Sequence, residues 1–324
     1  MNYEPKPLFM QRMKLLLKDE EDVKNFFEVS KTKPKKSFRV NTLRISPNEL
    51  ISRLKKYNWN LKQIENHPEI IQVRSELEPG ELGKTKEHIL GYYYIQEITS
   101  MMPILALDPK ANETLLDLCA SPGSKTTQAA AKMNNQGTII ANDVSIGRIT
   151  ILSSNLEKCG ITNTIVTLHD GLELCNRLKR LDYKFGKILV DAPCSGEGNI
   201  RLSPRTFLEW SEGMLERFGK KQKKLASSAL ELLKVNGEMV YSTCTHAPEE
   251  NEEVVQHLLD NYDIEILPIK LPLITRPGIL EWKGKTFDKS MSKAVRIYHH
   301  DNDMEGFFLC KIQKLSDKKK EKKL

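Results

Sequence analysis

Two short apolar segments of the sequence end in a cysteine, and the first of them also carries an aspartate. Residues 187–190 lead into the run Asp191-Ala-Pro-Cys194-Ser-Gly, and residues 237–243 lead into Cys244. Buried parallel strands have this composition where they end at the ligand-binding edge of an α/β sheet. If the two strands are neighbours, both thiols meet over one pocket. Two thiols beside a carboxylate indicate covalent chemistry on a bound substrate.

This trio suits methylation of a pyrimidine ring at carbon 5, which is not nucleophilic by itself. A thiolate that adds to carbon 6 makes carbon 5 enamine-like, so carbon 5 can attack a sulfonium methyl, and loss of its proton expels the thiolate. Such a site needs one cysteine below the ring, a carboxyl near N3 and the exocyclic amine, and a base or second thiol for elimination. Asp191, Cys194 and Cys244 provide these groups. The alternative is inert packing at strand ends, which the polar, turn-rich settings of both cysteines disfavour.

A strand and loop further upstream predict a cofactor site. The strand spans residues 113–118, and its loop opens a helix whose N-terminal N–H groups suit the polar tail of a cofactor. The loop has one glycine, Gly123, so the G-x-G-x-x-G fingerprint is missing and NAD is disfavoured. Asp143 ends the second strand, where it can accept from both ribose hydroxyls, and Asp170 follows the third, near an adenine amino group. This set matches S-adenosylmethionine better than a pyrophosphate cofactor, although aspartates at strand ends are also common in turns.

Alternating strands and helices position these groups. Strands over 113–118, 138–142, 164–168, 187–191 and 237–243 are separated by helical segments. This alternation predicts an α/β fold with a parallel, doubly wound sheet and right-handed crossovers. Later strands are expected over 264–270 and 306–312, and upstream Ser46 and Pro47 fit the start of a helix. The predicted organisation is helices and a basic linker over 1–36, a small α+β RNA-binding domain over 37–95, the methyltransferase domain over 96–312, and a disordered basic tail over 313–324.

Composition narrows the class of protein. The 324 residues carry a formal charge of +7, concentrated in residues 1–100 and 313–324, as expected if these parts hold a polyanion; an ordinary solubilising surface explains the charge equally well. The six cysteines include no C-x-x-C pair, which argues against a metal site, and their wide spread argues against disulfides. No apolar run approaches the ~20 residues of a membrane span and no signal peptide is evident, so we expect a cytoplasmic protein without membrane association.

The ordered motifs resemble those of the Nop/Sun family of S-adenosylmethionine-dependent RNA 5-methylcytosine methyltransferases, over nearly the whole chain. The matching segments are F-R-V-N-T-L-R (38–44), D-L-C-A-S-P-G-S-K-T-T (117–127), Asp143 with Arg148, D-A-P-C-S-G-E-G (191–198), Y-S-T-C-T with E-E-N-E (241–245 and 249–252), and Arg296 with His300 and G-F-F (306–308). The resemblance implies a Rossmann-like class I methyltransferase with a mostly parallel, seven-stranded sheet.

The resemblance also implies roles for individual residues. Cys244 would be the nucleophile, Cys194 would assist release of the methylated product, and Asp191 would contact the target cytosine near the sulfonium, with Lys125 helping to hold the base. The methionine part of the cofactor would rest on the loop, and its ribose on Asp143 with Arg148 nearby. The adenine would lie near Asp170. The loop consists of Cys119, Ala120, Ser121, Pro122, Gly123, Ser124 and Lys125.

The sequence departs from the family pattern at three positions. Ser121 and Ser124 replace an alanine and the second glycine of an A-A-P-G-G-K loop, so close approach of the loop to the ligand is less assured. His299 replaces the proline of a Pro-His pair, which puts the rigidity of that loop in question.

The expected partner is RNA, because a stacked base must be flipped or already unpaired before its carbon can react. Compact members of the family most often act on tRNA, so we favour tRNA over ribosomal RNA, and we expect a monomer. Basic candidates for following the phosphate backbone are Arg39, Arg44, the linker 31–36, and the helix with Arg217, Lys220, Lys221, Lys223 and Lys224. Two rival functions are amino-methylation and a catalytically silent RNA-binding or ribosome-assembly scaffold; the two cysteines and the cofactor acids disfavour both.

Overall fold

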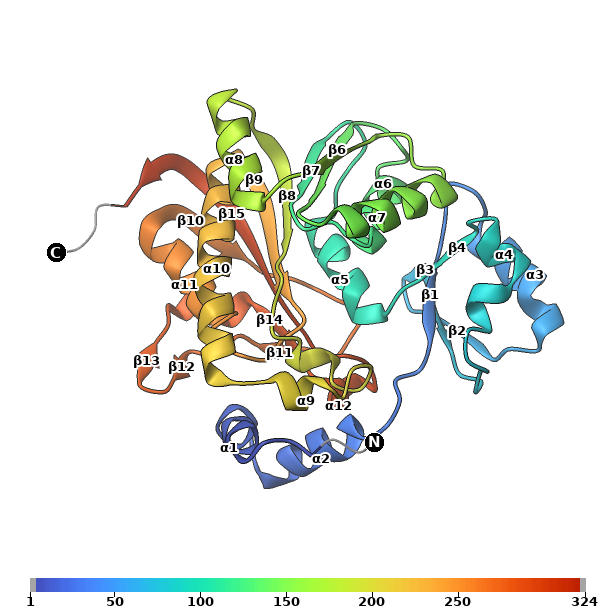
Figure 1. Ribbon diagram of the computed structural model, residues 1–324, viewed down its shortest axis with the longest axis horizontal. Coiled ribbons are helices and arrows are strands. Elements are labelled where there is room, and N and C mark those ends of the chain that lie inside the picture. Colours follow the sequence, from blue (N-terminus) through green and yellow to red (C-terminus); the bar gives the residue numbers. More distant parts are fainter. Residues whose placement is uncertain (1–3, 321–324) are drawn as a thin grey trace.

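The computed structural model describes residues 4–320, which form two N-terminal helices, a small lobe and a large α/β domain (Figure 1). Among these residues, no helix is both long enough and apolar enough to cross a membrane. The last four residues of the predicted basic tail, 321–324, lie outside the described part.

The first two helices pack on the large domain rather than on the small lobe. They are α1 (Pro7–Leu16) and α2 (Glu20–Ser30), and the linker that follows is non-helical, as its proline predicts. The Phe9 ring lies 5.4 Å from the Trp210 ring, measured between centroids, and Phe26 packs on His246. Both helices lie beside α9 (Thr206–Glu209) and α12 (His299–Asn302) (Figure 1). Their apolar faces therefore complete the surface near the ends of the catalytic strands.

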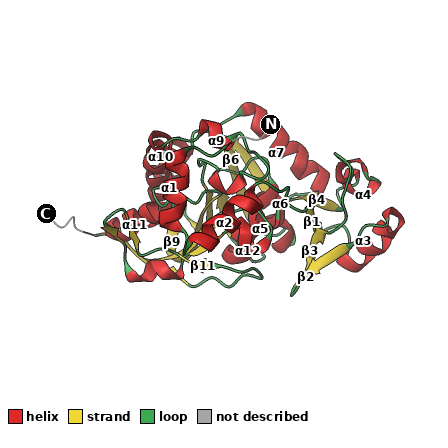
Figure 2. Ribbon diagram, turned by 90° about the horizontal axis from the view of Figure 1, so that it is seen from below, coloured by secondary structure: helices red, strands yellow, loops and turns green. Residues whose placement is uncertain are grey.

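The small lobe is an antiparallel sheet with helices on its outer side (Figure 2). Helix α3 (Pro47–Leu54) is capped by Ser46, whose hydroxyl oxygen accepts the Glu49 N–H at 3.3 Å. Pro47 occupies the first turn of this helix, as predicted. The strand order is β2 (Leu61–Ile64), β3 (His67–Val73), β1 (Ser37–Val40), β4 (Tyr93–Ile95), with helices α3 (Pro47–Leu54) and α4 (Lys86–Ile89).

One prediction for this lobe is wrong: Arg39 does not face solvent or an RNA backbone. All four residues of β1 are buried, and the Arg39 guanidinium donates to the side chains of Gln96 and Thr127, at 3.1 and 2.9 Å. The alternating pattern correctly separates two faces of the strand. It does not reveal that the second face is covered by the large domain, which turns a polar face into a domain contact.

The central sheet has nine strands among the described residues, where seven were expected. Its order is β11-β14-β15-β9-β8-β5-β6-β7, and β10 pairs with β15. β10 pairs with Lys311 to Lys319 of β15 and β14 with Phe307 to Leu309, so these two strands share one position beside β15. The sheet is parallel from β7 to β9, as predicted, and antiparallel at β15. The principal strands are β5 (Thr114–Asp117), β6 (Thr138–Asp143), β7 (Thr164–Leu168), β8 (Phe185–Asp191), β9 (Leu233–Thr243), β10 (Tyr262–Leu267), β14 (Val295–Ile297) and β15 (Phe307–Lys319).

Helices cover both faces of this sheet, as continuous apolar strands require. Along β8, Ile188 and Val190 enter one core, and Leu189 enters the core on the opposite face. One face is covered by α5 (Ile98–Leu107), α6 (Ser124–Lys132) and α7 (Ile146–Cys159), and the other by α8 (Gly171–Arg180), α10 (Glu212–Glu231) and α11 (Glu252–Asn261) (Figure 1). The shorter elements are β11 (Arg276–Pro277), β12 (Glu281–Trp282) and β13 (Lys285–Thr286), and the 3-10 turns η1 (Lys55–Tyr57), η2 (Leu82–Lys84), η3 (Glu197–Asn199) and η4 (Lys289–Lys293).

The predicted disorder of the basic tail is wrong for residues 313–319, which continue β15. Lys314 pairs with Ile264 of β10, and its amine donates to the carbonyls of Leu230 and Leu233, at 3.3 and 2.9 Å. Because the ladder bonds and the amine are both satisfied, this lysine-rich segment can extend the sheet instead of remaining in solvent.

Candidate active site

The two cysteines meet, as the sequence predicts. β8 and β9 are parallel neighbours with Asp191 opposite Ser242, so the segments that follow both strands leave the sheet at the same edge. The Sγ atoms of Cys194 and Cys244 lie 3.1 Å apart, and both residues are half-buried free thiols.

The surroundings of Cys194 favour its protonated form. The hydrogen bond to the Cys244 sulfur, burial and the negative charge nearby raise the pKa of Cys194 well above its ordinary value. Cys194 therefore keeps its proton and can donate S–H to the sulfur of Cys244. A thiolate at Cys244 is stabilised by this contact, because a hydrogen bond to a charged acceptor is stronger than one to a neutral group.

Asp191 and Lys125 form a charged pair beside the thiols. The Lys125 Nζ lies 2.7 Å from Asp191 Oδ2 and donates to the Ser100 hydroxyl at 3.0 Å. Ser242 donates to the other carboxylate oxygen at 2.8 Å. The lysine also lies 5.4 Å from the centroid of the Phe307 ring. The carboxylate is thereby held in one orientation at the end of β8.

Two glycines allow the catalytic segments to pack closely. Gly198 N–H donates to the Cys244 carbonyl at 2.9 Å, and Gly306 N–H donates to the Gly198 carbonyl at 2.8 Å. A Cβ on Gly198 would lie 2.3 Å from the Gly306 oxygen, so the backbone contact requires glycine there.

Four of the predicted cofactor residues, Cys119, Asp143, Arg148 and Asp170, line a cleft at the same edge of the sheet. Asp143 Oδ1 accepts the Ser145 N–H at 3.1 Å, and its Oδ2 accepts the Ser121 N–H and contacts Arg148, both at 3.3 Å. The cleft is lined by Leu118, Cys119, Asn142, Asp143, Val144, Arg148, Asp170, Gly171, Pro193, Lys221 and Leu225. The anchored Asp143 carboxylate offers acceptors for hydroxyl donors such as those of a ribose.

Asp170 caps a helix beside this cleft. Its Oδ1 accepts the N–H groups of Leu172 and Glu173 at 2.9 and 3.4 Å, which caps α8.

Asp117 lies beneath the loop, where burial and then the charges of Asp191 and Asp143 raise its pKa to about 7. Its protonated form keeps like charge from accumulating under the loop.

The departures from the family loop are accommodated. Gly123 has φ +100°, and a Cβ there would meet the Leu152 side chain at 2.8 Å, so this position requires glycine. Ser124 is the first residue of α6 and has no positive φ, so a second glycine is not needed for the backbone. The Ser121 hydroxyl donates to the Arg148 carbonyl at 3.0 Å, and the Ser121 backbone carbonyl accepts from the Arg148 guanidinium at 2.7 Å. The substitution therefore connects the loop to α7.

The third departure, His299, also has a defined contact. It is buried, and its Nε2 lies 2.8 Å from the Phe26 carbonyl of α2. Burial lowers the pKa of His299 to about 3, so the ring is neutral and its N–H donates to that carbonyl. A hydrogen bond that a proline could not make thus ties this loop to α2.

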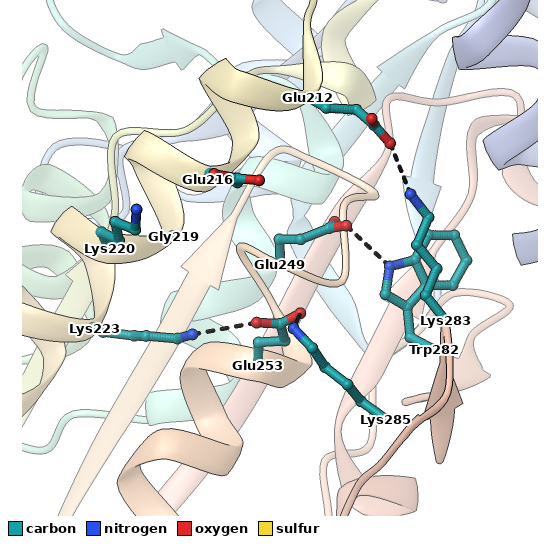
Figure 3. Close-up of a pocket in the computed structure, with 10 residues that line it drawn as sticks. All are labelled: Glu212, Glu216, Gly219, Lys220, Lys223, Glu249, Glu253, Trp282, Lys283 and Lys285. Carbon is teal, nitrogen blue, oxygen red and sulfur yellow. Dashed lines mark hydrogen bonds and ion pairs between the residues drawn. The ribbon is translucent and has the colours of Figure 1, made fainter.

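The basic helix face is less uniform than the sequence suggests. Lys221 lines the cofactor cleft, whereas Lys220 and Lys223 line a cavity of about 390 Å³ between α10 and the β12–β13 hairpin (Figure 3). In this cavity Lys223 lies 3.3 Å from Glu253, and Lys283 lies 2.7 Å from Glu212. On α10, Lys223 is therefore paired with a carboxylate of α11.

The structure also shows contacts that sequence reasoning missed. Ser100, Ser242 and Phe307 hold the Lys125–Asp191 pair, and no local pattern distinguishes them from ordinary strand and helix residues. Glu250 and Asn251 lie in the matched E-E-N-E motif, which drew attention to them without giving either a role.

The Rossmann-like sheet, with its cofactor cleft and thiols at one edge, is a methyltransferase fold. Residues 104–313 match the family model described as 16S rRNA methyltransferase RsmB/F, and residues 6–98 match the N-terminal domain of 16S rRNA methyltransferase RsmF. The chain belongs to the RsmB/F methyltransferase family, which confirms the resemblance read from its motifs.

Relatives in this family carry two kinds of name. The chain is 38% identical over 314 residues to ribosomal RNA small subunit methyltransferase F of Vibrio cholerae, an alignment that covers 96% of this chain and 64% of that protein. It is 39% identical over 293 residues to tRNA (cytosine(49)-C(5))-methyltransferase of Pyrococcus abyssi, which covers 86% of this chain and 88% of that protein.

Solved structures agree on the fold. A methyltransferase homologue from Pyrococcus horikoshii superposes with a TM-score of 0.84 at 35% identity, over 96% of this chain and 95% of that one. NSun6 from the same organism, solved with SFG, superposes with a TM-score of 0.83 over 96% and 98% of the two chains; its 24% identity supports the fold alone.

Proposed function

We propose that the protein transfers a methyl group from S-adenosylmethionine to carbon 5 of a cytosine in RNA, through a covalent bond between Cys244 and carbon 6. The observation that carries this proposal is the 3.1 Å contact between the Cys194 and Cys244 sulfurs beside the Lys125–Asp191 pair. A thiol-free site would fit methylation of an amine, whereas one thiol for addition and a second for elimination fit chemistry at a pyrimidine ring.

The residues at the site suggest how the base is recognised and attacked. Asp191 accepts from the exocyclic amine of cytosine, and it would repel the carbonyl that uracil places there. Cys244, as the thiolate, forms a bond to carbon 6, and the displaced electron pair makes carbon 5 the nucleophile. Bound S-adenosylmethionine supplies an electrophilic methyl group on a sulfonium. Carbon 5 would take this methyl group while the electron pair of the broken sulfur–methyl bond stays on the sulfur of S-adenosylhomocysteine, and carbon 5 still carries its own proton.

Release reverses the addition. Water takes the carbon-5 proton, the carbon 5–carbon 6 double bond forms again, and the sulfur–carbon bond breaks with its electron pair returning to Cys244. The S–H group of Cys194 stabilises the departing thiolate by a hydrogen bond. Loss of Cys194 therefore slows release more than formation of the adduct.

We expect S-adenosylmethionine to bind in the cleft, and the contacts of three residues support this. Asp143, fixed by two N–H groups and Arg148, accepts from the ribose hydroxyls. The free oxygen of Asp170 accepts from the adenine amine. The 119–125 loop would hold the methionine end of the cofactor.

We favour tRNA as the substrate, in agreement with the Pyrococcus abyssi relative, most of which the alignment covers. Ribosomal RNA is the second candidate, because the family model and the Vibrio cholerae relative carry that name.

The test is a denaturing gel of Cys194→Ala incubated with S-adenosylmethionine and either bulk tRNA or ribosomal RNA, beside Cys194→Ala/Cys244→Ala. We expect a retarded protein–RNA band with tRNA in the single variant and no band in the double variant. A band with ribosomal RNA alone would keep the mechanism and overturn the substrate. Full methyl transfer by Cys244→Ala would overturn the covalent mechanism itself.

A further inference from the structure

We infer that the consecutive residues Glu250 and Asn251 are positioning residues that each fix one catalytic thiol, so that Asn251 serves formation of the adduct and Glu250 serves its release. This inference rests on the proposed function and adds to it separate roles for two neighbouring side chains. Both residues are fully buried in the segment that follows β9.

Asn251 holds the chain on both sides of Cys244. Its Oδ1 accepts the Thr243 hydroxyl at 2.6 Å, and its Nδ2 donates to the Thr245 carbonyl at 2.9 Å. An amide is the side-chain group that has one acceptor and one donor for these two partners. The backbone that carries Cys244 is therefore fixed by bonds to the residue before it and the residue after it.

Glu250 holds the chain around Cys194 in a similar way. Its Oε2 accepts the Ser195 N–H at 3.0 Å and the Gln222 side-chain amide at 2.8 Å. Gln222 in turn donates to the Pro193 carbonyl at 2.8 Å. A carboxyl oxygen that accepts two N–H groups thus fixes the residues on both sides of Cys194, one directly and one through Gln222.

Because Glu250 and Asn251 are adjacent in the chain, their side-chain bonds set the distance between the two thiols. A direct bond between the hydroxyls of Ser195 and Thr245, 2.8 Å apart, joins the two held segments. Other bonds fix Glu250 itself, since Tyr241 donates its hydroxyl to the Glu250 carbonyl at 2.6 Å.

The flanking residues anchor this pair to other elements. Glu249 lies 2.6 Å from Arg12 of α1, and Glu252 lies 2.5 Å from Arg296 of β14. The 249–252 segment is therefore attached at both ends, and neither Glu250 nor Asn251 is needed to hold the segment in place. Their bonds are directed at the residues beside the thiols instead.

The test uses the two stages of the reaction as separate readouts on the same gel. In otherwise wild-type protein, Glu250→Ala should accumulate a protein–RNA band, because release slows by about 10- to 100-fold when Cys194 is misplaced. Glu250→Gln keeps an acceptor for the Ser195 N–H and should release RNA as the wild type does. Gln222→Met, a change on a different element, should accumulate the band to a smaller extent.

The second stage is tested in the Cys194→Ala background, where release is blocked. Adding Asn251→Ala should slow appearance of the band by about 10- to 100-fold, because the Cys244 backbone loses both bonds. Asn251→Asp keeps the acceptor for Thr243 but loses the donor to Thr245, so it should slow the band as well. Adding Glu250→Ala should leave the rate of band formation within about threefold.

Each outcome has a defined meaning. No band for Cys194→Ala alone would refute the proposed function and this inference with it. A band for Cys194→Ala but none for active Glu250→Ala would refute the inference alone, as would equal slowing of band formation by Glu250→Ala and Asn251→Ala. Thermal melting of each variant identifies misfolding, and if Glu250→Ala does not fold, absence of the band in folded Gln222→Met refutes the assignment of Glu250.

Discussion

Gly198→Ala should separate catalysis from folding at the contact between the two catalytic segments. The added Cβ would lie 2.3 Å from the Gly306 oxygen and 3.0 Å from the Cys244 oxygen, whereas ordinary contact begins at 3.4 Å. The backbone must therefore give way by about 1 Å, and a displacement of that size at reacting groups costs about 100-fold in rate. The stability cost of one overpacked methyl is smaller, about 1–3 kcal/mol.

The assay is transfer of a labelled methyl group from S-adenosylmethionine to RNA, with urea unfolding measured on the same preparations. Gly186→Ala is the matched control, because a Cβ on Gly186 of β8 meets no atom within 4 Å. We expect the control to transfer methyl groups at the wild-type rate and Gly198→Ala to lose about 100-fold. Wild-type transfer by folded Gly198→Ala would refute the view that backbone contact at this glycine sets the position of Cys244.

Two further predictions concern ion pairs away from the reacting atoms. Glu252→Ala should lower the free energy of unfolding in urea by about 3–5 kcal/mol, because it leaves the buried Arg296 cation without its partner; a loss under 1 kcal/mol would contradict this. The hydrogen bond from Arg276 holds the pKa of Asp22 well below its ordinary value, so the stability it contributes is complete above about pH 4 and is lost as the pH falls further. Asp22→Asn should therefore flatten the fall in melting temperature between pH 4 and pH 2, and an unchanged slope would contradict the assignment.

The position of the thiols could be predicted because it depends on strand ends alone. Asp191 and Cys194 follow one apolar strand and Cys244 follows another, and parallel neighbours bring such residues to one edge of the sheet. The hydrogen bonds that hold these residues could not be predicted. Glu250 reaches back to Ser195 across 55 positions of the chain, and no local pattern encodes that contact.

The wrong predictions for Arg39 and for the basic tail share a physical cause, which is burial of charged side chains by tertiary packing. Arg39 and Lys314 look like surface residues by composition, yet they are 3% and 4% exposed. Each is buried because acceptors from distant elements satisfy its donors. A sequence shows the charge of a residue but not the acceptors that will surround it.

The packing of α1 and α2 on the large domain has a consequence for synthesis of the chain. These helices are made before the residues on which they pack, since Phe26 contacts His299, a residue 273 positions later. At about 5–20 residues per second, that interval lasts on the order of ten to sixty seconds. Phe9 meets Phe207 and Trp210, and Phe26 meets His299, so each ring lacks these partners until they have been made. Until then the nascent chain exposes apolar side chains of α1 and α2 that the finished fold buries.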